Sequence, residues 1–125
     1  MSRLSNLALF LALSAAVVAS TLPRTAVAAV RDGIWSVLVI TEKGECDRGY
    51  RYEVKVAKGH ITYNGDLGIN LAGTVASDGA TKVSIQAGEK GASGTGHLSE
   101  RSGAGVWHGI GAAGSCAGRW EAELK

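Results

Sequence analysis

The sequence predicts an all-β protein, a small eight-stranded antiparallel up-and-down β-barrel. Two observations point to this class: apolar and polar residues alternate with a period of two over most of residues 33–124, and glycine-rich turns separate the alternating runs. A third is that the first and the last run each carry a tryptophan on an apolar strand, which favours closure of the sheet by pairing the two ends. A β-sandwich built from the same strands is the alternative.

Residues 1–28 have the pattern of a cleaved signal peptide. Arg3 precedes an apolar stretch over residues 4–19, and Ala26-Val27-Ala28 fits the small-x-small cleavage rule. The apolar stretch is short for a membrane span, which needs about 20 residues. We therefore expect an exported protein, periplasmic or extracellular, whose residues 29–125 form a single barrel domain without a membrane span.

The charge balance argues against nucleic acid as a partner. The formal net charge is +2, and Arg3 and Arg24 of the predicted signal peptide account for it. Residues 29–125 therefore carry equal numbers of basic and acidic side chains, and no run of Lys or Arg. All 18 glycines lie in this part, but the segments between them are too apolar for disorder.

The first two expected strands differ in pattern. Residues 35–41 form an almost unbroken apolar run, as expected for a strand that is covered on both faces. Residues 50–56 alternate strictly, with Tyr50, Tyr52 and Val54 facing the core in step with Val56.

Short turn signals bound the next three strands, which cover residues 60–63, 71–75 and 81–86. Lys58-Gly59 predicts a tight hairpin, and Ser77-Asp78-Gly79 predicts a second turn. Tyr63 faces the core in this register.

The last strands, at residues 93–98, 102–108 and 116–124, are rich in glycine. A turn at Glu100-Arg101 sets the register of the first two: Leu98 opposite Gly103, Gly96 opposite Gly105, and Gly94 opposite Trp107. Such glycines allow sharp coiling, and a ring over a facing glycine covers its exposed backbone. A glycine-rich surface for the approach of a ligand is the alternative interpretation.

Aromatic side chains are the expected filling of this barrel. The six assigned to the structural core are Trp35, Trp107, Trp120, Tyr50, Tyr52 and Tyr63. With so many rings in a barrel of eight strands, we expect no room for a sizeable ligand. Trp35 is expected to plug one end.

The two cysteines are expected to form one disulfide. Cys46 follows the first strand and Cys116 opens the last, so antiparallel pairing of these strands brings the two together.

Gly33-Ile34-Trp35 on the first strand and Arg119-Trp120 on the last resemble the calycin pattern of lipocalin-like and avidin-like barrels. In those families a tryptophan of the first strand packs near a basic residue of the last; here the alternation places Trp120 inside and Arg119 outside. The chain is also similar to a group of short exported bacterial proteins whose function is not established and to which heme utilisation or adhesion labels are sometimes attached.

No catalytic motif is recognised. The sequence lacks a nucleophile elbow, a zinc-protease motif, a phosphate loop and a dinucleotide fingerprint. His60, His97 and His108 are expected in solvent, and Glu121 and Glu123 alternate outward on the last strand. We expect no enzyme activity, no cofactor and no metal site.

The function that remains is that of a non-enzymatic, monomeric exported binding protein. Two alternatives stay open. One is an inhibitor of a hydrolase such as lysozyme or a protease, since Cys46-Asp47-x-Gly49 resembles part of a motif in bacterial lysozyme inhibitors; the other is a carrier of a small ligand or heme.

A protein or glycan partner is expected at the end of the barrel where the longer connections lie, at residues 43–49, 64–70, 87–91 and 110–115. The candidate contact residues are Glu45, Arg48, Asp66, Leu67 and Ile69. Leu67 and Ile69 have a second interpretation, as a lid folded over the barrel mouth.

Overall fold

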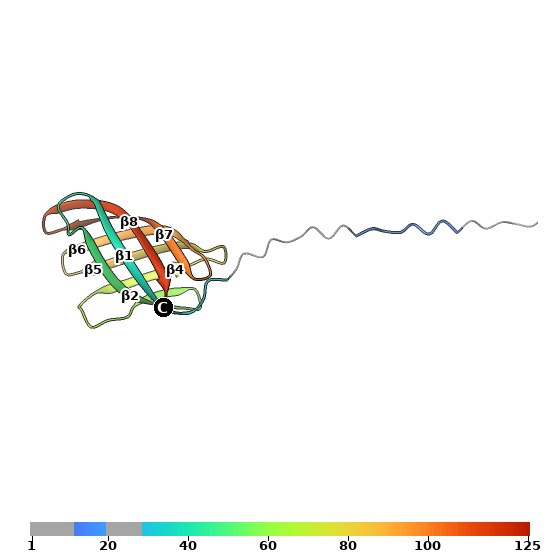
Figure 1. Cartoon of the computed structure of the whole chain (residues 1–125), viewed down its shortest axis with the longest axis horizontal. Helices are drawn as coiled ribbons and strands as arrows, with labels where there is room; N and C mark the ends of the chain where they lie inside the picture. The colour runs from blue at the N-terminus through green and yellow to red at the C-terminus, as the bar shows by residue number, and fades with distance from the viewer. Residues whose placement is uncertain (1–11, 20–28) are drawn as a thin grey trace, which may run out of the picture.

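The computed structural model describes residues 12–19 and 29–125, and it confirms the all-β class (Figure 1). Residues 12–19 carry no regular secondary structure; the rest of the predicted signal peptide lies outside the described residues. The strands are β1 (Gly33–Lys43), β2 (Gly49–Ala57), β3 (His60–Tyr63), β4 (Asn70–Val75), β5 (Ala80–Ala87), β6 (Lys90–Leu98), β7 (Ser102–Gly111) and β8 (Gly114–Leu124). No helix of the described part is long and apolar enough to cross a membrane.

The eight strands form one closed barrel, so the sandwich alternative is wrong. Each strand pairs antiparallel with its neighbours in the sequence, and β1 also pairs with β8. Figure 1 shows β1 and β8 side by side, although they are the first and the last strand in the sequence. Closure leaves the sheet without an unpaired edge, as the two tryptophan-bearing ends predicted.

The alternation along each strand sorts side chains into an inner and an outer face. On β2, Tyr52 and Val54 face inward while Arg51 and Lys55 are exposed, as predicted. Tyr63 pairs with Val54 and so shares the inner face. On β8, Trp120 is buried and Glu121 is exposed. A period of two along the sequence thus becomes two physically different surfaces.

The glycine-rich pairing of β6 with β7 has the predicted register, with Gly94 opposite Trp107 and Gly96 opposite Gly105. The ring that covers these glycines, however, is not Trp107 but Trp120 of the neighbouring β8. A Cβ atom added at Gly96 or at Gly105 would lie 2.6 Å from the Trp120 indole. The glycines therefore leave space for one large ring to lie flat against the barrel wall.

The connections alternate between the two ends of the barrel. One end, called here the closed end, carries the β2–β3, β4–β5 and β6–β7 turns. Lys58 and Gly59 both have positive φ, 50° and 79°, as a two-residue hairpin of the expected kind requires. The other end, called here the open end, carries the remaining four connections.

Two connections at the open end are shorter than predicted. Residues 88–89 alone join β5 to β6, and residues 112–113 alone join β7 to β8. Strands β5 to β8 therefore extend further than their alternating cores, through glycines and alanines that the sequence analysis assigned to loops. Only the β1–β2 loop (residues 44–48) and the β3–β4 loop (residues 64–69) are longer connections.

The most tightly packed side chains gather at the closed end. The buried cluster consists of Trp35, Val54, Val56, Ile61, Leu98, Trp120 and Ala122. Trp35 is fully buried at this end, and its indole N–H donates to the carbonyl oxygen of Arg31 at 3.0 Å.

The segment before β1 crosses this end and seals it. The Arg31 guanidinium donates two hydrogen bonds to Glu100 Oε1, at 2.9 and 2.6 Å, and Val30 packs on the buried cluster. The Asp32 carboxylate accepts a hydrogen bond from the backbone N–H of Lys58 at 3.1 Å. The three residues together tie the start of the domain to two of the turns at the closed end.

Candidate functional site

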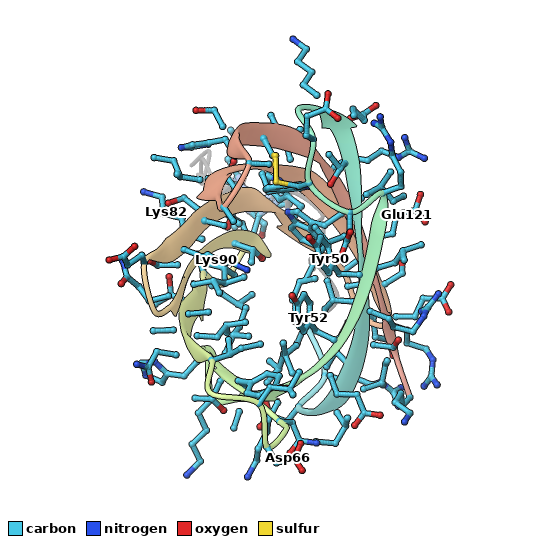
Figure 2. The ribbon with its side chains drawn as sticks, turned by 90° about the vertical axis from the view of Figure 1, so that its left-hand side faces the viewer. Tyr50, Tyr52, Asp66, Lys82, Lys90 and Glu121 are labelled. Atoms are coloured by element: carbon cyan, nitrogen blue, oxygen red, sulfur yellow. A yellow bond between two sulfur atoms is a disulfide. The ribbon has the colours of Figure 1, made fainter. Side chains whose placement is uncertain are left out.

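A cavity of about 340 Å³ lies inside the barrel and opens at the open end (Figure 2). Side chains from both halves of the barrel line it, from Trp35 at the bottom to Cys46 and Lys90 near the mouth. The expectation that aromatic rings leave no room was wrong. Part of the reason is that Trp120 lies flat on glycines of β6 and β7, so its ring adds little volume to the centre.

The wall of the cavity is largely apolar. Its aliphatic part is formed by Val37, Val39, Val54, Val56, Ile61, Leu71, Val83, Ile85, Ala87, Ala92, Leu98, Ile110 and Ala122. The two tryptophans of the wall turn their polar atoms to the backbone: Trp107 Nε1 donates to the Ile40 carbonyl at 3.0 Å, and Trp120 Nε1 donates to the Thr95 carbonyl at 3.3 Å. Their ring faces are left as apolar contact surface.

Tyrosines form a stripe at one side of the mouth. Tyr50 and Tyr52 follow each other on the inner face of β2, with ring centroids 6.1 Å apart and nearly parallel planes. Tyr63 of β3 meets Tyr52 edge-on at 6.4 Å. Burial, and next the neighbouring Tyr50, Tyr63 and Asp47, raise the pKa of Tyr52 above its ordinary value. The Tyr52 phenol therefore remains protonated at neutral pH.

Lys90 lies on the opposite side of the mouth. It begins β6 and pairs with Ala87 of β5, and both residues line the cavity. In a closed ring of eight strands β6 lies opposite β2, and Figure 2 shows Lys90 facing Tyr50 and Tyr52 across the mouth. The sequence analysis missed Lys90, although a two-residue turn at residues 88–89 continues the inward parity of Ile85 and Ala87 to this position.

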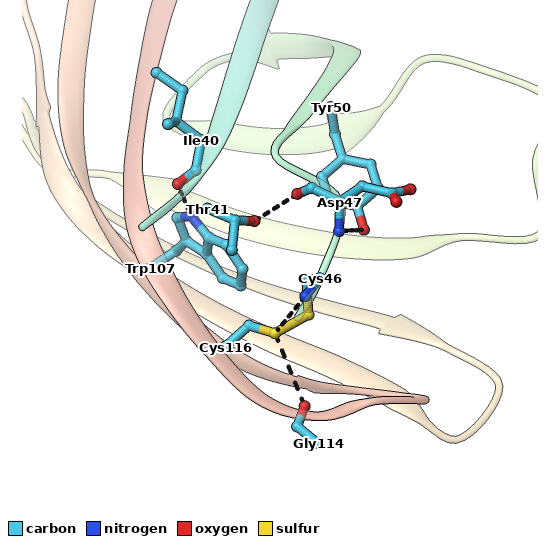
Figure 3. The surroundings of a disulfide bond; sticks show 8 residues. All are labelled: Ile40, Thr41, Cys46, Asp47, Tyr50, Trp107, Gly114 and Cys116. Atoms are coloured by element: carbon cyan, nitrogen blue, oxygen red, sulfur yellow. Dashed lines mark hydrogen bonds between the residues drawn. A yellow bond between two sulfur atoms is a disulfide. The ribbon is translucent and has the colours of Figure 1, made fainter. Parts of the chain in front are cut away.

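The predicted disulfide between Cys46 and Cys116 is present, with the Cα atoms 6.1 Å apart (Figure 3). It fastens the β1–β2 loop to β8 at the rim of the cavity. Thr41 adds two hydrogen bonds: its hydroxyl donates to the Asp47 carbonyl at 2.6 Å, and its N–H donates to the Arg48 carbonyl at 3.1 Å.

This held loop in turn positions one of the tyrosines. The backbone N–H of Asp47 donates to the Tyr50 hydroxyl at 3.2 Å, as Figure 3 shows. One rim of the mouth is therefore a braced structure rather than a loose loop.

The predicted partner residues lie at the open end but outside the cavity wall. Glu45 and Arg48 are exposed on the β1–β2 loop, and Asp66 points away from the mouth on the β3–β4 loop in Figure 2. Leu67 is 63% exposed, and neither it nor Ile69 lines the cavity. The lid interpretation of these two residues was therefore wrong; contact with a partner remains a prediction.

Histidines and carboxylates take no part in the cavity wall. His60, His97 and His108 are exposed, as predicted. Among residues 12–19 and 29–125, no group of three or more His, Cys, Asp or Glu side chains could hold a metal ion. His108 borders a broad depression of about 700 Å³ on the outer surface, which is open to solvent.

No protein-family model, curated protein or solved structure matches this chain.

Proposed function

We propose that this protein is an exported, non-enzymatic binding protein that carries one small, mainly apolar ligand inside its barrel. The observation that supports this most is the cavity itself: about 340 Å³, apolar in its walls, sealed at one end and open at the other. Ligand pockets generally measure about 300–1,000 Å³, so the cavity suits a small molecule. Eight-stranded barrels of the lipocalin and streptavidin kind hold one small ligand in the same place.

The resemblance to calycins is part of this proposal, and the barrel architecture supports it. The closed eight-stranded barrel is compatible with this resemblance, and Trp35 lies on the inner face of β1, as the calycin pattern requires. Arg119 departs from the pattern, because its guanidinium is on the outer face and bonds to Glu42. Arg31, which precedes β1, is the basic residue whose backbone meets the Trp35 indole.

Export is supported by the disulfide, because stable disulfides are typical of oxidising compartments. A non-catalytic role is supported by the composition of the cavity wall in the described part of the chain, where no Asp, Glu or His accompanies Lys90. Histidine and the carboxylates are among the usual general acids and bases, and of the other groups that can serve, the wall contains Lys90 and tyrosines.

Among the carrier hypotheses, a small organic ligand is favoured over heme. Each histidine of the described chain lies outside the cavity, and Cys46 and Cys116 are joined to each other. Of the usual axial ligands of heme iron, the described wall therefore offers only tyrosine hydroxyls. A hydrolase inhibitor needs a protruding loop. The exposed Leu67 on the β3–β4 loop is the observation that supports this second candidate function.

The test is to fill the cavity. Val83 lines the cavity between Gly73 and Gly94, its partners on the neighbouring strands, so a larger ring there would extend into free space. In Val83→Trp, binding of an apolar fluorescent probe should fall by about tenfold or more, since the ring occupies the volume of the ligand. Ser84→Trp, the matched control, places the same ring on the outer face.

The readouts are probe titration and native mass spectrometry of protein purified from its own host. The wild type and Ser84→Trp should each carry a small molecule, and Val83→Trp should show the bare mass. Equal probe affinity in all three proteins would contradict a ligand site inside the barrel.

A further inference from the structure

The cavity wall contains a single charged side chain in the described part of the chain, and that side chain is Lys90. Its neighbours on β5 and β6, Ala87 and Ala92, also line the cavity and are small, so the stem of Lys90 lies over an apolar wall. Figure 2 contrasts Lys90, which turns into the mouth, with Lys82, which points out from the barrel. An ammonium at the mouth of an apolar cavity is a specific feature of this inner face.

Lys90 is not used to pair with a carboxylate of the protein. The ion pairs found within residues 12–19 and 29–125 involve Arg31, Arg119 and Lys125, and Lys90 takes part in none of them. The ammonium has three N–H donors on a flexible stem. These donors are available to a group that enters the mouth.

The groups that face Lys90 are donors as well. Tyr50 accepts the Asp47 N–H through its hydroxyl oxygen, so its own proton remains to be donated. The Tyr52 hydroxyl makes no hydrogen bond within the described part of the chain, and its phenol is protonated at neutral pH. Two acids flank the mouth, Glu89 in the β5–β6 turn directly before Lys90 and Asp47 on the β1–β2 loop; both are exposed and neither lines the cavity.

We propose that the ligand is an amphiphile with an anionic head group, a carboxylate, bound at the mouth by Lys90, while its apolar part lies in the cavity below. A carboxylate only accepts hydrogen bonds, and it therefore matches a mouth that offers an ammonium and two phenolic donors. This inference rests on the proposed function, because it names the ligand class of the same cavity.

The experiment compares three probes that share one alkyl chain: decanoate, decanol and decylammonium, at neutral pH and below their aggregation concentrations. Calorimetry or displacement of a fluorescent probe gives each dissociation constant. Lys90→Gln should weaken decanoate about fivefold, the effect of losing one partly solvated charge pair, and should leave decanol unchanged.

Charge reversal sharpens the test. Lys90→Glu should weaken decanoate further and should strengthen decylammonium relative to the wild type. Lys82→Glu, the matched control, changes the net charge by the same amount on the outer face of β5, and should change no ratio between the probes.

The outcomes separate the two proposals. If all three probes bind the wild type with equal affinity, or if Lys90→Gln weakens decanol as much as decanoate, the anionic head group is excluded and the apolar carrier stands. If none of the probes binds, and Val83→Trp is also without effect, the carrier function fails and the head-group inference falls with it.

Discussion

The closed and the open half of this barrel are built from the same sheet but differ in how densely their side chains are packed. At the closed end, Trp35 is fully buried and the side chains around it form the buried cluster. At the open end, Val37, Val39, Leu71 and Trp107 remain only partly buried, because they face a cavity. Dense packing and free internal volume are therefore separated along the barrel axis.

Each half is held by a different device. The closed end is sealed by the chain itself, through Val30, Arg31 and Asp32. The open end is held by the Cys46–Cys116 disulfide, which stands at the rim and leaves the mouth clear. A covalent bond can brace a rim without filling it, whereas packing cannot.

The largest expected effect is on the closed end. Trp35→Ala should lower the free energy of unfolding by about 3–5 kcal/mol, because it leaves a cavity in the best-packed region. Trp107→Ala, in the open half, should cost clearly less, since its ring is already partly exposed. Urea unfolding followed by circular dichroism measures both. Equal losses of unfolding free energy in the two variants would contradict the proposed difference in packing between the closed and open halves.

The disulfide should contribute nearly as much. It closes a loop of 70 residues, for which the chain-entropy model gives about 4 kcal/mol. Cys46→Ala combined with Cys116→Ala should shift the urea midpoint accordingly and should weaken probe binding, because the β1–β2 loop carries the Tyr50 contact. Thiol labelling of the folded wild type without reductant should find no free cysteine. Full labelling would contradict the bond.

A glycine under Trp120 should matter less, but still measurably. A Cβ at Gly105 would lie 2.0 Å from the Thr95 carbonyl oxygen and 2.6 Å from the Trp120 ring. Gly105→Ala should therefore cost about 1–3 kcal/mol by overpacking. Gly49→Ala is the control, because no atom lies within 4 Å of the added methyl group and φ is not positive. A neutral Gly105→Ala would contradict this overpacking, because it would require both the Trp120 ring and the Thr95 backbone to shift at no cost.

The smallest effect concerns the end of the chain. Lys125 donates to Glu53, and this hydrogen bond and charge hold the pKa of Glu53 below its ordinary 4.5. A lowered folded-state pKa adds stability above the unfolded value and loses it as pH falls through the folded value. Lys125→Ala should thus be slightly less stable than wild type at pH 7, and the difference should shrink as pH falls below 4.5 and vanish once pH is below the lowered folded-state pKa. A difference that persists there would assign the effect to packing.

Much of the fold could be predicted because strand parity is a local property. The period of two placed Tyr50, Tyr52 and Trp120 on the inner face, and one assumed turn at Glu100-Arg101 gave the register of Gly94 with Trp107. The pairing of the cysteines followed from closure of the ring. These inferences required only the local sequence pattern, the position of one turn and the rule that sheets avoid free edges.

The cavity could not be predicted in the same way, because it depends on how rings lie rather than on how many face inward. Trp120 fits against glycines of two other strands, and its orientation is a three-dimensional fact. The ends of β5 to β8 were missed since Ala87, Gly91 and Gly111 have weak strand propensity, and pairing across the hairpins overrides it. Lys90 was overlooked because its turn was taken as a longer loop.

Pairing of β1 with β8 also sets the order in which the protein can be completed. Strand β8 pairs with both β1 and β7. Until residues 114–124 are available, β1 and β7 therefore each expose an unpaired edge. Contacts this far apart in sequence are slow to form, on the order of milliseconds to seconds for barrels of this type. Closure of the barrel must therefore wait until residues 114–124 have been synthesised. A chain that stops short of β8 would have no means to close, and its open edges would pair with other chains instead.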